Sequence, residues 1–322
     1  MYLKRPLRKL ILIAALIFLL GVTPVAQAFT GIYGGCNDTD RNLYLTEPRL
    51  SGDDVLELQE RLQQLGYYQG KLDGIFGEKT QQAVKQFQSA GKMNVTGQVG
   101  PATWDKLSAG IKAPPVITNS APDRQPDKQV SILIDTNKKT LTLLNNGEPL
   151  KTFPCAVGKG STPTPVGEWK IVHKGGNWGG GFGVRWMGLN VPWGIFGIHG
   201  TNKPYSIGSP ASHGCIRMFN EHVRTLYEEV EVGTAVKIVG EPKMPPNAKF
   251  RKSMHRDAVG PDVVQVQLAL KEKGFLIGPA DGRFGPATEL AVKFLQVRTD
   301  MEDTGIVEEE TYEALELLTP KS

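Results

Sequence analysis

Two short stretches of the chain contain residue types that are typical of an active site. They are His199-Gly200 and Ser212-His213-Gly214-Cys215-Ile216-Arg217-Met218. A thiol is a strong nucleophile only as the thiolate, and a neighbouring imidazole can remove its proton. A glycine after each histidine leaves room beside the backbone for a substrate, and leaves N–H groups able to point at an oxyanion. The pattern therefore predicts that Cys215 is a nucleophile served by a histidine base.

The residues alone do not decide which histidine serves Cys215. Side chains two positions apart in an extended segment share a face, so His213 would lie beside Cys215. His199 is distant in sequence and could lie near Cys215 only through the tertiary fold. Arg217 lies on that face as well. Its planar guanidinium suits a substrate carboxylate, and it suits a structural ion pair equally well.

The surrounding sequence carries a family resemblance. The stretches Thr162-Pro163-Thr164-Pro165-Val166-Gly167 and Gly233-Thr234-Ala235-Val236-Lys237-Ile238, together with the two histidine stretches, resemble the YkuD-type L,D-transpeptidase catalytic domain. The resemblance covers residues 128–240. It departs from the family at Arg217, where many members carry asparagine.

This resemblance implies roles for single residues. Cys215 would be the nucleophile and His199 the base, with the carbonyl of Gly200 orienting the imidazole. The N–H groups of Gly214 and Cys215 would form the oxyanion hole. Among the other residues of the motif, Ser212 and His213 would support the pocket, and Arg217 would bind the substrate.

The family reaction attacks a tetrapeptide stem at its third residue, expels D-alanine and passes the acyl group to the amine of another stem, which gives a 3-3 cross-link. If water takes the acyl group instead, the same residues make an L,D-carboxypeptidase. A noncatalytic wall-binding protein is a third interpretation, and the presence of both nucleophile and base argues against it. A zinc site at His173, His199, His213 and Cys215 matches no compact ligand spacing, so no metal or cofactor is expected.

An internal repeat occupies the two ends of the chain. At an offset of 208 positions the copies align without a gap, including Gly66 with Gly274, Asp73-Gly74 with Asp281-Gly282, Phe76-Gly77 with Phe284-Gly285, Thr80 with Thr288, and Gly97 with Gly305. Apolar residues at helical spacing predict three helices in each copy, over residues 50–110 and 255–318. Both copies resemble the peptidoglycan-binding domain 1 family, which implies a wall anchor. Stem peptides and glycan are therefore the expected partners of a monomeric protein.

The rest of the chain is β-rich. Residues 131–135, 140–144, 169–172 and 235–239 have strand composition, and 221–230 are predicted to form a helix. Proline-rich linkers are expected at 111–127 and 241–254. The predicted fold is multidomain α+β, with a sandwich-like β-rich catalytic domain between two small three-helix domains.

The N-terminus has the pattern of a secretory signal, with basic residues, an apolar run and Ala26-Gln27-Ala28 at a cleavage position. Cleavage after Ala28 predicts an exported protein in the cell wall or extracytoplasmic space; the alternative is an uncleaved membrane anchor. Removing residues 1–28 takes 4 of the 37 basic residues and no acid, which leaves 33 against 33. A bulk positive charge that would attract nucleic acid is then absent.

The chain has three cysteines, which is an odd count for an exported protein. Cys215 is the expected unpaired thiol. A disulfide between Cys36 and Cys155 is possible on composition alone, with no geometric support.

Overall fold

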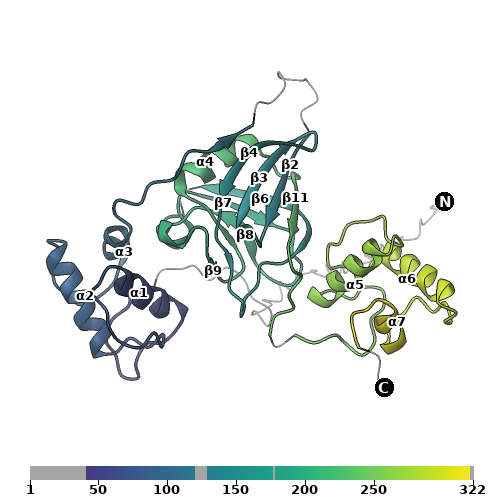
Figure 1. Ribbon diagram of the computed structural model, residues 1–322, viewed down its shortest axis with the longest axis horizontal. Helices are drawn as coiled ribbons and strands as arrows, with labels where there is room; N and C mark the ends of the chain where they lie inside the picture. The colour runs from purple at the N-terminus through teal and green to yellow at the C-terminus, as the bar shows by residue number, and fades with distance from the viewer. Residues whose placement is uncertain (1–40, 120–128, 177, 247, 320–322) are drawn as a thin grey trace, which may run out of the picture. The chain divides into compact units, whose positions relative to one another are not determined.

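The computed structural model describes residues 41–119, 129–176, 178–246 and 248–319 (Figure 1). The predicted signal peptide and Cys36 lie outside the described residues. Within those ranges no helix is both long enough and apolar enough to span a membrane.

The first module, residues 50–110, has the three predicted helices, α1 (Asp53–Gln64), α2 (Glu78–Ala90) and α3 (Pro101–Leu107). Pro101 stands at the start of α3, where a missing backbone N–H costs no helical hydrogen bond. The helices close around a buried apolar core that includes Val55, Leu58, Leu62, Val84 and Trp104. The apolar residues at helical spacing in this module therefore form its hydrophobic core, as the sequence predicts.

A buried glutamine explains the Asp-Gly turn that marks the repeat. Oε1 of Gln59 accepts hydrogen bonds from the N–H groups of Asp73 (3.1 Å) and Gly74 (2.9 Å), and Nε2 donates to Asp73 Oδ1 (3.0 Å). This side-chain bond is the largest cause of a lowered pKa at Asp73. Gly74 has a φ of 67°, a left-handed conformation that glycine adopts without strain.

The second module, residues 255–318, repeats this construction with α5 (Pro261–Glu272), α6 (Pro286–Arg298) and α7 (Glu309–Ala314). Gln267 accepts a hydrogen bond from the N–H of Gly282 (2.8 Å), as Gln59 does in the first module. Tyr312 replaces Trp104 and is buried in the core of this module. The two modules therefore share one fold and one turn-locking device.

The domain between the two modules is built on a nine-stranded sheet in the order β1-β4-β3-β2-β11-β6-β7-β8-β10 (Figure 1). The strands are β1 (Ile117–Thr118), β2 (Val130–Asp135), β3 (Thr140–Asn145), β4 (Glu148–Pro154), β6 (Gly167–Gly176), β7 (Arg185–Leu189), β8 (Phe196–His199), β10 (Ile216–Arg217) and β11 (Ala235–Val239). A smaller pair joins β5 (Val157–Gly158) to β9 (Pro210–Ser212). The predicted mixed α+β architecture is confirmed.

One expectation about the first linker is wrong. Ile117 and Thr118 lie within the segment predicted to be a linker, yet they form β1 and pair with Thr152 and Lys151 of β4. The strand is short and exposed on both residues, so it leaves no burial pattern in the sequence. The linker is thus partly an edge strand of the sheet.

Strand β6 joins the two halves of the sheet. It pairs with β11 over its first residues and with β7 from Ile171 onward, where the register shifts. Such an irregularity lets one strand belong to two differently oriented sheet regions. Side chains from both halves, including Leu143 of β3 and Ile198 of β8, then share one core with Leu226 of helix α4 (Asn220–Glu229). This curled sheet is the sandwich-like arrangement expected, and α4 covers β7 (Figure 1).

We predict that Gln59→Leu destabilises the first module, because the N–H groups of Asp73 and Gly74 lose their acceptor. A buried polar group left unpaired costs about 1–3 kcal/mol. Hydrogen exchange on the full-length protein should therefore be faster in the first module and unchanged in the second. Gln63→Leu, at an exposed position of the same helix, is the control. Equal protection of the first module in both variants would contradict this role.

Candidate active site

The pairing of two strands brings the two histidine stretches together. Strand β10 runs parallel to β8, with Ile216 opposite Ile198 and Arg217 opposite His199. Cys215 directly precedes β10, and its Sγ accepts a hydrogen bond from the N–H of Gly197 (3.3 Å). Because partners in a parallel ladder share a face, this register places Cys215 and His199 on the same side of adjacent strands. The structure thus places the more distant of the two candidate bases on the same side of the sheet as Cys215.

His199 is held by its neighbours in one orientation. It is fully buried, and its Nδ1 lies 2.6 Å from the carbonyl oxygen of Gly200. Since a carbonyl only accepts, Nδ1 carries the proton and Nε2 is the basic nitrogen of the neutral ring. The ring stacks on Trp186 (centroids 5.6 Å) and meets Phe182 edge-on (5.2 Å). An imidazole in this tautomer and setting is suited to accept a proton through Nε2.

Ser212 organises the turn that carries the cysteine. Its hydroxyl donates to the carbonyl of Cys215 (2.5 Å) and accepts from the N–H of Gly214 (3.1 Å). Gly214 has a φ of 112°, where a side chain would be strained. In this structure the N–H of Gly214 therefore bonds to Ser212, and the oxyanion role assigned to Gly214 stays a prediction.

The space beside the two glycines is not left for a substrate, contrary to our expectation. A Cβ on Gly200 would lie 2.2 Å from Oδ1 of Asn220, and one on Gly214 would lie 2.7 Å from the ring of Phe196. Glycine at both positions therefore permits close packing by neighbouring parts of the same domain.

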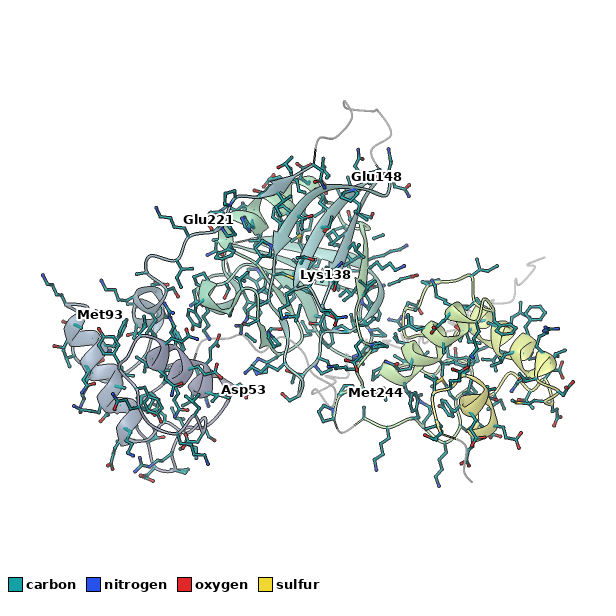
Figure 2. The ribbon with its side chains drawn as sticks, viewed as in Figure 1. Asp53, Met93, Lys138, Glu148, Glu221 and Met244 are labelled. Atoms are coloured by element: carbon teal, nitrogen blue, oxygen red, sulfur yellow. The ribbon has the colours of Figure 1, made fainter. Side chains whose placement is uncertain are left out.

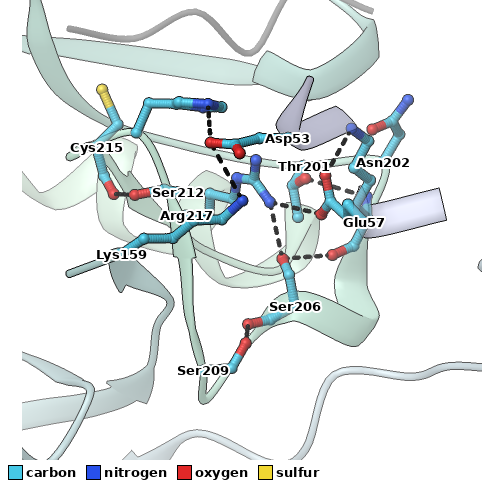
Figure 3. A network of polar contacts seen from close by, with 12 residues as sticks. Asp53, Glu57, Lys159, Thr201, Asn202, Ser206, Ser209, Ser212, Cys215 and Arg217 are labelled. Carbon is cyan, nitrogen blue, oxygen red and sulfur yellow. Dashed lines mark hydrogen bonds and ion pairs between the residues drawn. The ribbon is translucent and has the colours of Figure 1, made fainter. Parts of the chain in front are cut away.

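His213 contacts a carboxylate of the first module. Its Nε2 lies 3.0 Å from Oδ2 of Asp53, which stands at the start of α1 and is labelled in Figure 2. Nζ of Lys159 lies 3.5 Å from the same oxygen (Figure 3). The sequence suits Asp53 to the first turn of a helix and predicts no site role for it. The contact is consistent with a supporting role for His213, which stays a prediction.

Arg217 is almost fully buried and holds a carboxylate from the chain itself. One of its guanidinium nitrogens donates to Oε1 of Glu57 in α1 (2.9 Å) and to the hydroxyl of Ser206 (3.3 Å). Figure 3 shows Glu57 beside Arg217. Oε2 of Glu57 accepts from Nζ of Lys203 (3.0 Å), and the same Nζ lies 4.3 Å above the ring of Trp104. The ion-pair interpretation of Arg217 therefore has a named partner. Substrate binding by Arg217 stays a prediction, and it would require Arg217 to release the carboxylate of Glu57.

The cysteines differ from expectation. Cys155 is a free and buried thiol, so it forms no disulfide with Cys36. Burial raises the pKa of Cys155 to about 12, which keeps this thiol protonated and unreactive at neutral pH. Cys215 is disulfide-bonded in this structure. The expectation that Cys215 carries the unpaired thiol is therefore wrong here, and reduction must precede any chemistry at its sulfur.

Several residues of this site carry no signal in the sequence. Asn220, Trp186 and Lys203 belong to no motif, and they reach the site only through the fold. Glu57 likewise gave no signal, because it lies away from the apolar stripe of Val55, Leu58 and Leu62 on its helix and is buried by its contacts with Lys203 and Arg217. Among the described residues, no three His, Cys, Asp or Glu side chains are grouped as metal ligands would be.

We predict that Cys215 reacts with iodoacetamide only after reduction, because a disulfide sulfur has no thiolate to alkylate. Peptide mapping by mass spectrometry, with and without dithiothreitol, measures this directly. Cys155 is the internal control and should stay unmodified in the folded protein under both conditions. Complete alkylation of Cys215 without reductant would contradict the prediction.

Comparison with known proteins agrees with this architecture. Residues 129–238 match the L,D-transpeptidase catalytic domain family, and residues 51–107 and 259–315 each match the peptidoglycan-binding domain. The YkuD protein of Bacillus subtilis is 48% identical over 107 residues, which are 33% of this chain and 64% of that protein. The YkuD protein of Bacillus licheniformis is 46% identical over 116 residues, which are 36% of this chain and 69% of that protein. The names of both proteins place them among the L,D-transpeptidases.

A solved structure is also similar to this chain. It is the crystal structure of an L,D-transpeptidase from Xylanimonas cellulosilytica, 28% identical, and the match covers 59% of this chain and 94% of that one with a TM-score of 0.31. The family assignment is based on the sequence identity to the Bacillus proteins and not on this structural similarity. The chain belongs to the L,D-transpeptidase family.

Proposed function

We propose that the protein, once Cys215 is reduced, is a cysteine-dependent L,D-transpeptidase that forms 3-3 cross-links in peptidoglycan. The observation that carries this proposal is the parallel pairing of β10 with β8. It places the cysteine and an oriented histidine on one face of adjacent strands, which is what acyl transfer through a thioester requires.

The chemistry follows from the orientation of the imidazole. Nε2 of His199 takes the proton of the Cys215 thiol, and the sulfur attacks the carbonyl carbon that joins the third stem residue to D-alanine. The C–N bond breaks, and His199 returns the proton to the amine of D-alanine. An acceptor amine then attacks the thioester, loses its proton to Nε2 and releases the sulfur. The hydrogen bond from Nδ1 to Gly200 holds the ring in the tautomer that both transfers need.

The two modules support the choice of substrate. Peptidoglycan is the partner that both matched domain types share. We infer that the modules keep the enzyme on insoluble wall, where the local concentration of stems is high. We also infer that the chain is exported as a monomer after cleavage behind Ala28, which brings it to that substrate.

We predict that the reduced enzyme converts soluble tetrapeptide stems to 3-3 linked dimers, because an acceptor amine competes with water for the thioester. Mass spectrometry with fragmentation locates the new bond. Free D-alanine and tripeptide alone, at every acceptor concentration, would contradict transpeptidation and favour the L,D-carboxypeptidase alternative.

We predict that His199→Ala slows acylation of Cys215 by about two to four orders of magnitude, as expected for loss of a general base. His213→Ala should cost far less, because that ring contacts Asp53. A higher pH should partly restore His199→Ala, since more of the thiol ionises without a base.

Circular dichroism must first show that both histidine variants are folded. Normal acylation by folded His199→Ala, together with its loss in folded His213→Ala, would assign the base to His213 instead.

A further inference from the structure

Helix α1 of the first module carries two carboxylates to the catalytic domain, at one end of the helix and one turn further on. Asp53 contacts His213, and Glu57 contacts both Arg217 and Lys203. The side chains around Glu57 are buried, with exposed fractions of 8% for Glu57, 4% for Lys203 and 2% for Arg217. This is therefore an internal charge cluster and not a surface salt bridge.

Buried cations require a buried counter-charge. An ammonium or guanidinium that loses its carboxylate in such a setting keeps the cost of desolvation without the compensating attraction. Each oxygen of Glu57 serves a different cation, so one side chain ties two parts of the catalytic domain together. The ring of Trp104 in the same module covers the Lys203 ammonium.

These two cations lie directly beside the reacting groups. Arg217 is two residues after Cys215 and pairs in register with His199. Lys203 lies in the loop that follows His199, and its N–H donates to the hydroxyl of Thr201 (3.0 Å). Glu57 thus connects the strand that follows the nucleophile to the loop that follows the base.

The second module shows that its fold does not require these carboxylates. At the offset of 208 residues, Pro261 stands for Asp53 and Gln265 stands for Glu57, yet α5 forms with the same length as α1. The buried Gln59 and its counterpart Gln267 keep the same turn-locking role in both modules. The two acids are therefore features of the first module alone, and their contacts lie in the catalytic domain.

We propose that the first module is a structural part of the active site, and that Glu57 is a positioning residue for acyl transfer. It fixes Arg217 and Lys203, and through them the spacing of Cys215 and His199. The proposal rests on the transpeptidase function above. It also changes the expected role of this module, which then contributes to turnover of small soluble stems as well as to wall binding.

The test compares Glu57→Gln with Glu60→Gln in the full-length, reduced protein. Both variants remove one negative charge from α1, but Glu60 is exposed. On a small soluble tetrapeptide we expect Glu57→Gln to lower kcat by about 100-fold with KM changed little, because small displacements of reacting groups can cost that much. Glu60→Gln should behave as wild type, and both variants should still sediment with insoluble peptidoglycan.

A second readout separates failure of this proposal from failure of the proposed function. The rate of Cys215 alkylation by iodoacetamide after reduction needs no peptide substrate, and it should change in Glu57→Gln but not in Glu60→Gln. If wild type itself makes no peptide product, the function fails while alkylation still tests the positioning. Folded Glu57→Gln with kcat and alkylation rate within twofold of wild type would overturn the proposal.

Asp53→Asn is a second variant that tests the proposal if Glu57→Gln does not fold. Its side chain is partly exposed, so its loss leaves no buried cation unpaired. We expect kcat to fall by about tenfold, since His213 loses its contact beside Gly214 and Cys215. If Glu57→Gln is unfolded and folded Asp53→Asn has wild-type kcat, the positioning role is rejected.

Discussion

The parallel pairing of β10 with β8 is the constraint on which the site depends. The two paired residues of β10 set the register, and that register puts Cys215 and His199 on one side of adjacent strands and Arg217 opposite His199. The curl of the sheet makes the pairing possible, because β6 changes partners from β11 to β7 and carries the second half of the sheet over the common core. The small motif thus depends on the whole curled sheet for its geometry.

Local patterns predicted much of this fold. The apolar spacing of Leu58 and Leu62 identified α1, because burial of one helix face determines that pattern, and strand composition identified β2 and β3. The sequence also predicted a Cys–His site around Cys215. It left the choice between His199 and His213 open, since long-range strand pairing determines on which side of the sheet His199 lies.

Other features of the site have no local signature. Asn220 fills the space at Gly200 from a helix that follows the cysteine motif, and the disulfide state of Cys215 reverses the expected assignment of the unpaired thiol. Glu57 looks like an ordinary helical glutamate until the fold places it between two cations. The repeat offered a clue in retrospect, because the position equivalent to Glu57 is a glutamine in the second module.

The central claim is that acyl transfer passes through a thioester on Cys215. Rapid acid quenching of the reduced enzyme with a tetrapeptide donor and no acceptor, followed by peptide mapping, tests it directly. We expect the peptide containing Cys215 to gain the mass of the tripeptide acyl group, and the corresponding peptide of Cys215→Ala to gain none. An acyl group found on another residue, or the same adduct in Cys215→Ala, would contradict it.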